Sequence, residues 1–180
     1  LHAAWSFGPG VRLLDGGTQG LYLLPYVEGC PRLLILDAVD YGLAPGTLKL
    51  VRDQAVPAFM GVRKMSLHQT GFQEVLSVAR LRGWDPEGLA LVGCQPEVLE
   101  DYGGSLSATV KGRLPQALAL ALETLAGWRV WPRRRLSPPG PGEGTTLDSL
   151  GLTPYEDERP SAALACRVGD GRFVGGLSCV

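Results

Sequence analysis

Asp37 and His68 are side chains of the types that bind a divalent metal ion. Asp37 directly follows an apolar run at residues 33–36, and His68 precedes an amphipathic segment that begins at Gly71. A carboxylate and an imidazole on neighbouring connections of a sheet are suitable ligands for Zn²⁺ or Ni²⁺. Because open parallel sheets bind ligands beyond the carboxyl ends of their strands, both residues are candidates for one metal site.

Further polar and glycine residues fall at the same predicted edge. We expect them to line a substrate cleft, and they are Asp15, Gly16, Gly17, Thr18, Asp40 and Gln69. Each candidate also has a plainer interpretation. Asp15 could cap a turn through its side chain, Asp40 could be a solvated turn residue, and His68 could be structural.

Other reaction chemistries lack their motifs. The sequence has no G-x-G-x-x-G or Walker pattern, and Gly103-Gly104-Ser105 lacks the preceding strand that a nucleophile elbow needs. The cysteines lie too far apart for a zinc knuckle or a redox pair, which favours reduced thiols in the cytoplasm. These cysteines are Cys30, Cys94, Cys166 and Cys179.

Apolar periodicity predicts the elements that must position these residues. The expected strands are 11–15, 32–39, 47–51 and 89–94. The expected helices are 21–28, shortened or bent by Pro25; 71–82; and 110–125, kinked or restarted at Pro115. Apolar strands alternating with helices indicate an α/β fold, with a mostly parallel sheet covered on both sides.

Composition separates three regions and excludes some partners. Residues 1–129 form the predicted α/β domain, 130–146 a Pro/Gly/Arg-rich linker and 147–180 an extended tail. The formal net charge of −1 argues against nucleic acid and anionic membranes as partners. No apolar stretch is long enough for insertion into a membrane.

Five ordered motifs resemble those of the [NiFe]-hydrogenase maturation endopeptidases, in particular the branch that serves membrane-bound uptake hydrogenases. They are DGGTQG (15–20), LILDAVDYG (34–42), KMSLHQTG (64–71), LVGCQP (91–96) and LEDYGGSL (99–106). The resemblance runs from about residue 11 to residue 127, and more loosely through the tail. It implies a three-layer α/β/α sandwich around a twisted, mostly parallel sheet.

The resemblance also implies an activity. Members of the family remove the C-terminal extension of the hydrogenase large-subunit precursor after nickel insertion, using one Glu, one Asp and one His at the metal. Asp37 matches the Asp and His68 the His of this family. The nickel is supplied by the bound precursor, so the expected protein is a metal-dependent endopeptidase of the cytoplasm.

One departure from the family pattern concerns the start of the chain. The strand, Gly-x-Gly-Asn loop and Glu that open other members are absent, and Leu1-His2-Ala3-Ala4-Trp5 is typical of the last turn of a helix. We therefore expect an N-terminally incomplete fold. The alternative function is a fragment that binds the precursor without cutting it; an unrelated α/β hydrolase is a more distant alternative.

Overall fold

The computed structural model describes residues 1, 3–14, 16, 20–60, 67–98 and 106–137; of residues 58–60 and 67–71 it describes only the backbone. In chain order the elements are β1 (Trp5–Ser6), the 3₁₀ helix η1 (Gly20–Leu23), α1 (Leu24–Glu28), β2 (Arg32–Ala38), β3 (Leu48–Arg52), α2 (Ala55–Met60), α3 (Leu67–Leu81), β4 (Gly88–Cys94), α4 (Ala108–Lys111), α5 (Leu114–Gly127) and β5 (Arg133–Arg134).

A three-stranded sheet of order β2-β4-β3 forms the centre of the described fold. β2 runs parallel to β4, with Asp37 opposite Gly93. β3 runs antiparallel to β4, with Lys49 opposite the same Gly93. The expected α/β fold is confirmed, and its sheet is mixed because β3 is antiparallel.

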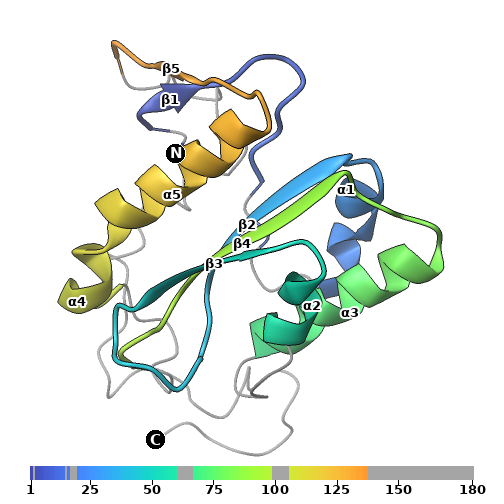
Figure 1. The fold of residues 1–180 in the computed structure, drawn as a ribbon, viewed down its shortest axis with the longest axis horizontal. Coiled ribbons are helices and arrows are strands. Elements are labelled where there is room, and N and C mark those ends of the chain that lie inside the picture. The colour runs from blue at the N-terminus through green and yellow to red at the C-terminus, as the bar shows by residue number, and fades with distance from the viewer. Residues whose placement is uncertain (2, 15, 17–19, 61–66, 99–105, 138–180) are drawn as a thin grey trace, which may run out of the picture.

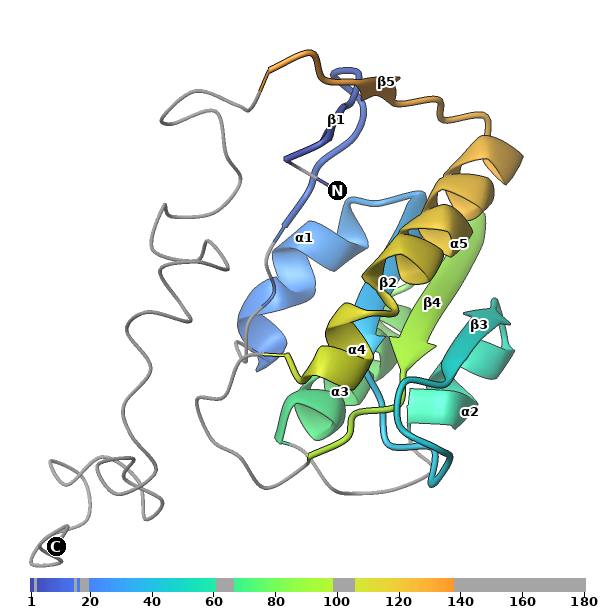
Figure 2. The same cartoon turned by 90° about the vertical axis from the view of Figure 1, so that its left-hand side faces the viewer.

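Helices cover both faces of this sheet. Figure 1 shows α5 on one side and α1, α2 and α3 on the other, and Figure 2 shows α5 lying along the strands. The larger core is on the α3 side, where Val75 and Leu76 cluster with Leu89 and Leu91 of β4. Alternate residues of a strand share one face of the sheet, so Gly93 lies on the same side as Leu89 and Leu91. Its register partner Asp37 lies on the α3 side as well.

The local sequence explains the positions of these elements. β4 reads GLALVGC and is buried from Gly88 to Gly93, as a central strand requires. Pro25 and Pro115 stand in the first turns of α1 and α5, where the missing proline N–H breaks no helical hydrogen bond. The predicted restart of the last helix at Pro115 is therefore confirmed.

Some predicted elements differ from the structure. The strand predicted at 11–15 is wrong for residues 11–14, which form no strand, and residue 15 lies outside the described residues. Apolar side chains of that run line a pocket instead. α3 begins at Leu67, before the predicted start at Gly71. Gly71 therefore lies inside the helix, where a glycine is tolerated at a modest cost.

The two ends of the described chain lie side by side. Residues 3 and 4 form a turn, the Trp5 amide donates to the Leu1 carbonyl at 3.0 Å, and β1 follows. β1 pairs antiparallel with β5, so the first part of the predicted linker 130–146 is ordered against the start of the chain (Figure 2). Residues 138–180, which include the predicted tail, lie outside the described residues.

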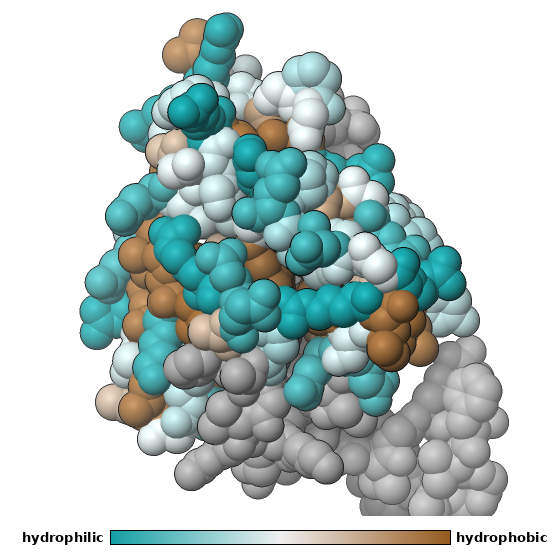
Figure 3. Space-filling model, turned by 45° about the vertical axis from the view of Figure 1, so that its right-hand side comes forward, coloured by the Kyte–Doolittle hydropathy of each residue, from teal (hydrophilic) through white to brown (hydrophobic). Residues whose placement is uncertain are grey.

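Among the described residues, no helix has both the length and the apolar character needed to cross a bilayer. The face in Figure 3 is largely hydrophilic and carries a few apolar patches. A single exposed apolar side chain, such as Leu81 on α3, is ordinary for a protein surface.

Candidate active site

Asp37 lies near the carboxyl end of β2, on the face of the sheet that α3 covers. Its side chain is half-buried, and its Oδ1 accepts a hydrogen bond from the Ala38 amide at 2.8 Å. This bond fixes one carboxylate oxygen relative to the backbone. The sheet thus presents the carboxylate at the edge where the sequence predicted a ligand site.

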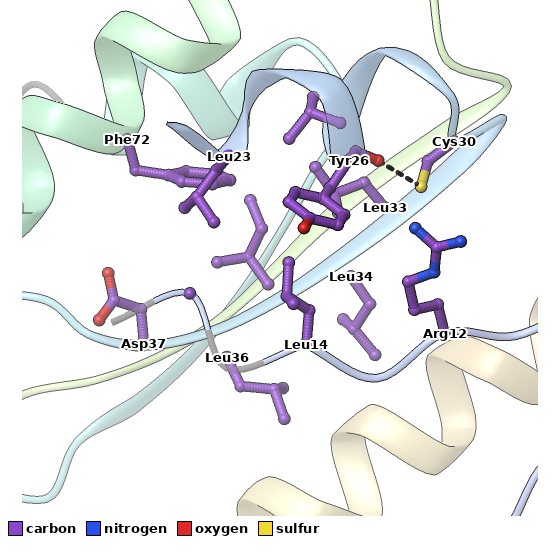
Figure 4. Close-up of a pocket in the computed structure, with 13 residues that line it drawn as sticks. Arg12, Leu14, Leu23, Tyr26, Cys30, Leu33, Leu34, Leu36, Asp37 and Phe72 are labelled. Atoms are coloured by element: carbon purple, nitrogen blue, oxygen red, sulfur yellow. Dashed lines mark hydrogen bonds between the residues drawn. The ribbon is translucent and has the colours of Figure 1, made fainter. Parts of the chain in front are cut away.

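An apolar pocket of about 550 Å³ extends along β2 and has Asp37 at one end. Figure 4 shows Phe72 of α3 at the same end as Asp37, and Arg12 at the opposite end. The Arg12 guanidinium lies over the ring of Tyr26, 5.7 Å from its centroid. Leu14 and Leu36 form part of the wall, so the acidic group borders a largely apolar surface.

The first turn of α3 contains His68 and Gln69. The structure describes only the backbone of both residues. Phe72 comes four positions after His68, which is about one helical turn, and its side chain lines the pocket together with Asp37. The backbone of α3 therefore brings position 68 to within about one turn of the end of the pocket where Asp37 lies.

The remaining cleft candidates have different outcomes. Gly16 lines the pocket. Asp15, Gly17 and Thr18 lie outside the described residues. Within the described part of the chain, no group of three His, Cys, Asp or Glu side chains is arranged to hold a metal ion.

Asp40 does not line this pocket and is 5% exposed. Its Oδ1 accepts hydrogen bonds from the Gly42 amide at 2.9 Å and from Gln95 Nε2 at 3.0 Å. Gln95 Oε1 in turn accepts from the amides of Tyr41 and Leu43, at 2.7 and 3.2 Å. Asp40 is thus a buried turn residue that shapes the loop after β2, and not the solvated one considered above.

The phenol of Tyr41 folds back onto the sheet beside Asp37. A Cβ built on Gly93 would meet the Tyr41 hydroxyl, and it would lie 2.9 Å from Cζ of the same ring. Lys49, the other register partner of Gly93, places its Nζ 5.1 Å from the ring centroid. A carboxylate, a phenol and an ammonium group therefore follow one another across the sheet.

Burial and neighbouring charge perturb two groups at this edge. Burial, and then the negative charge of Asp37, raise the pKa of Tyr41 to about 12. Burial also raises the pKa of the Cys94 thiol, an effect that the positive charge of Arg113 opposes. The Tyr41 phenol is therefore protonated at neutral pH, and Cys94 is poorly suited to act as a thiolate.

The positions of Tyr41, Lys49 and Gly93 beside Asp37 were not predicted from the sequence. One signal was available, because a glycine inside the apolar run LALVGC indicates that another group approaches the strand closely. The identity of that group was not available. Tyr41 is far from Gly93 in sequence, and only the register of β3 on β4 adds Lys49 to the same row.

Comparison with known proteins agrees with the motifs and the fold. The family model described as "Hydrogenase maturation protease" matches residues 1–124. The chain belongs to the hydrogenase maturation protease family. The predicted family and enzyme class are thereby confirmed, and this family member is a processing endopeptidase.

Relatives and solved structures support the same assignment. The chain is 52% identical to the hydrogenase expression/formation protein HoxM of Cupriavidus necator over 174 residues, covering 97% of this chain and 86% of that protein. It is 51% identical to HupD of Rhodobacter capsulatus, covering 91% and 76%. The hydrogenase-maturating endopeptidase HybD of Escherichia coli has a TM-score of 0.68 at 38% identity, covering 73% and 81%.

Proposed function

We propose that this hydrogenase maturation protease removes the C-terminal extension of a [NiFe]-hydrogenase large-subunit precursor after nickel insertion, in the cytoplasm. Family membership and the relatives named as hydrogenase expression/formation proteins support the choice of substrate. The nickel ion belongs to the incoming precursor. It marks those precursors that have received their metal.

One relationship in the structure carries this proposal. Asp37 and Phe72 border the same end of the pocket, and His68 lies one turn before Phe72 on α3. In the proposal, the Asp37 carboxylate and the His68 imidazole bind the nickel ion of the precursor. Carboxylate and imidazole form a chemically suitable donor pair for that ion.

The chain's own residues then have defined tasks. Asp37 is held by the Ala38 amide through Oδ1, so its orientation is set before the substrate arrives. The apolar walls of the pocket, including Leu14 and Phe72, exclude water around the peptide that continues from the metal. When bound, the nickel ion would supply a positive charge that polarises nearby oxygen atoms.

The experiment incubates the full chain with nickel-loaded precursor and follows the shortened product. Asp37→Asn and His68→Ala should each lower kcat/KM by more than about 100-fold, above the effect usual for a residue that only supports a ligand. Asp85→Asn is the matched control for the first variant, because Asp85 is exposed and lies outside the pocket. His2→Ala replaces the other histidine of the sequence.

Each outcome has a distinct meaning. Selective loss of cleavage in the Asp37 and His68 variants supports the assigned site. Cleavage at the parent rate by either variant contradicts it. A parent chain that binds nickel-loaded precursor but never shortens it favours the alternative, a precursor-binding protein without catalytic activity.

A further inference from the structure

The pocket that begins at Asp37 lies along the outer edge of β2. Its lining includes every residue of that strand from 33 to 37. Because successive residues of a strand point to opposite faces of the sheet, a pocket on one face would be lined by alternate residues only. β4 pairs with the inner edge of β2, and within the described part of the chain no strand pairs with the outer edge. The pocket is therefore a groove along this outer edge, the β2 groove.

The β2 groove has an apolar surface that is open to solvent. Leu36 of β2 is 50% exposed, and Leu14, which lines the groove from a second segment of the chain, is 45% exposed. The described residues around Leu14, 11–14, belong to no helix or strand. An extended apolar peptide would cover this surface and supply the main-chain partners that an edge strand lacks.

The two ends of the β2 groove carry opposite charges. Asp37 lies at one end and Arg12 at the other (Figure 4). Arg12 is exposed, and among the described residues its guanidinium makes no ion pair. Apart from Asp37, no acidic side chain of the described residues lines the groove. The Arg12 end is therefore suited to a carboxylate that a ligand brings with it.

The proposed function sets the direction of a peptide in this groove. The metal-bound part of the precursor is at Asp37, near the carboxyl end of β2, and the extension follows it in the precursor chain. The groove leads from Asp37 back toward Arg12 (Figure 4). An extension that follows the groove therefore runs antiparallel to β2. Residues 33 and 37 are about 13 Å apart along the strand, a length that about four residues of an extended peptide span.

We propose that the extension of the precursor binds in the β2 groove as an additional strand, antiparallel to β2, and that an acidic side chain of the extension binds Arg12. This inference rests on the proposed function, because the nickel-bearing end of the precursor sets the direction of the peptide. Main-chain hydrogen bonds to β2 supply affinity that does not depend on sequence. The apolar lining and Arg12 select apolar residues followed by an acidic one.

Pulsed hydrogen exchange tests the position of the extension. The full chain is labelled alone and with saturating nickel-loaded precursor, in a pulse shorter than one turnover. Amides of residues 33–36 that do not bond to β4 should exchange at least about 10-fold more slowly with precursor, because each gains a hydrogen-bond partner. The internal control is β3, which forms the other edge of the described sheet and should not change.

Three results of this measurement overturn the proposal. Exchange at residues 33–36 that does not change with precursor means that the extension lies elsewhere. Slow exchange of all these amides in the chain alone means that another strand of the same protein already fills the groove. Protection that rises with the concentration of the chain itself means that a second copy occupies it.

Arg12→Gln tests the charged end of the groove. KM for nickel-loaded precursor should rise about 10-fold, as expected for the loss of a hydrogen bond between charged groups. The kcat should stay near the parent value, because Arg12 lies at the end of the groove away from Asp37. The matched control is Arg134→Gln, at an exposed position of β5 outside the groove. A KM for Arg12→Gln equal to that of this control overturns the proposal.

Asp37→Asn separates this inference from the proposed function. If Asp37→Asn loses cleavage while Arg12→Gln keeps the parent KM and residues 33–36 stay unprotected, Asp37 keeps its role and the β2 groove loses its own. If Asp37→Asn cleaves precursor like the parent, the proposed metal site is wrong, and the direction assigned to the peptide falls with it.

Discussion

The hydroxyl of Tyr41 stands where the side chain of residue 93 would be if that residue were not glycine. This relationship joins two sequence motifs, LILDAVDYG after β2 and LVGCQP at the end of β4. Gln95 joins them a second time, because it binds the backbone of Tyr41 and the side chain of Asp40. The two motifs therefore form one structural unit behind Asp37.

Gly93→Ala should destabilise the fold by about 1–3 kcal/mol, the usual cost of an overpacked site. Without the contact to Tyr41, the opposite sign would be expected, since Gly→Ala commonly stabilises where the backbone permits it. Chemical denaturation measures the free energy of unfolding. The control is Gly10→Ala, where an added Cβ meets nothing within 4 Å. Equal effects at the two positions would contradict the close approach of Tyr41.

The contact also predicts coupling between the two residues. Gly93→Ala should cost less in a Tyr41→Ala background, because the phenol that it displaces is gone. A coupling free energy of about 0.5–3 kcal/mol is usual for side chains in contact. Denaturation of the parent, both single variants and the double variant measures it. Simple additivity would mean that residues 41 and 93 do not touch.

Gln95→Glu should destabilise the fold by at least about 2 kcal/mol at neutral pH, because it replaces a donor to Asp40 with a second buried carboxylate. Burial and Asp40 would raise the folded-state pKa of the new carboxyl above its unfolded value. The deficit should therefore shrink as the pH falls through that raised pKa. Unfolding at several pH values measures this recovery.

The matched control for that substitution is Gln116→Glu, which adds the same charge at an exposed position of α5. Its free energy of unfolding should stay within about 0.5 kcal/mol of the parent value at each pH. A Gln95→Glu variant as stable as this control would contradict the role given to Gln95 in the loop after β2.

Tyr41 should titrate later than an ordinary tyrosine, with a pKa of about 12. Folding raises this pKa, so the folded state favours the protonated phenol. The stability that this proton contributes is fully present below pH 10 and is lost as the pH rises toward 12. Ultraviolet titration of phenolate absorbance, with Tyr41→Phe as reference, checks that Tyr41 ionises at a higher pH than an ordinary tyrosine. Titration of Tyr41 together with exposed Tyr22 would contradict the burial described here.

The elements with strong sequence periodicity were predictable. β2, β4 and α5 appear close to their expected ranges, since continuous apolar runs and a helical stripe require burial. The run at 11–14 misled the prediction because an apolar run can line a pocket as well as form a strand. α2 was missed because it is short and Pro57 interrupts its pattern.

Some residues of the candidate site were also predictable from the sequence, and others were not. Asp37 could be found because it follows a buried strand, where ligand-binding residues collect. The roles of Asp40 and Tyr41 depend on where the loop after β2 turns back, and that geometry is set by Gln95, distant in sequence. The position of Lys49 opposite Gly93 depends on the register of β3 on β4, which the pairing of these two strands determines.

The most direct measurement of the central claim is a double-mutant cycle on kcat/KM for nickel-loaded precursor with Asp37→Asn, His68→Ala and the combined variant. If both residues bind one metal ion, each single change should remove most of the activity. The double variant should then be little worse than the poorer single one, because ligands that act as a unit are strongly non-additive. Parent-like rates in either single variant, or losses that multiply in the double variant, would contradict a shared metal site.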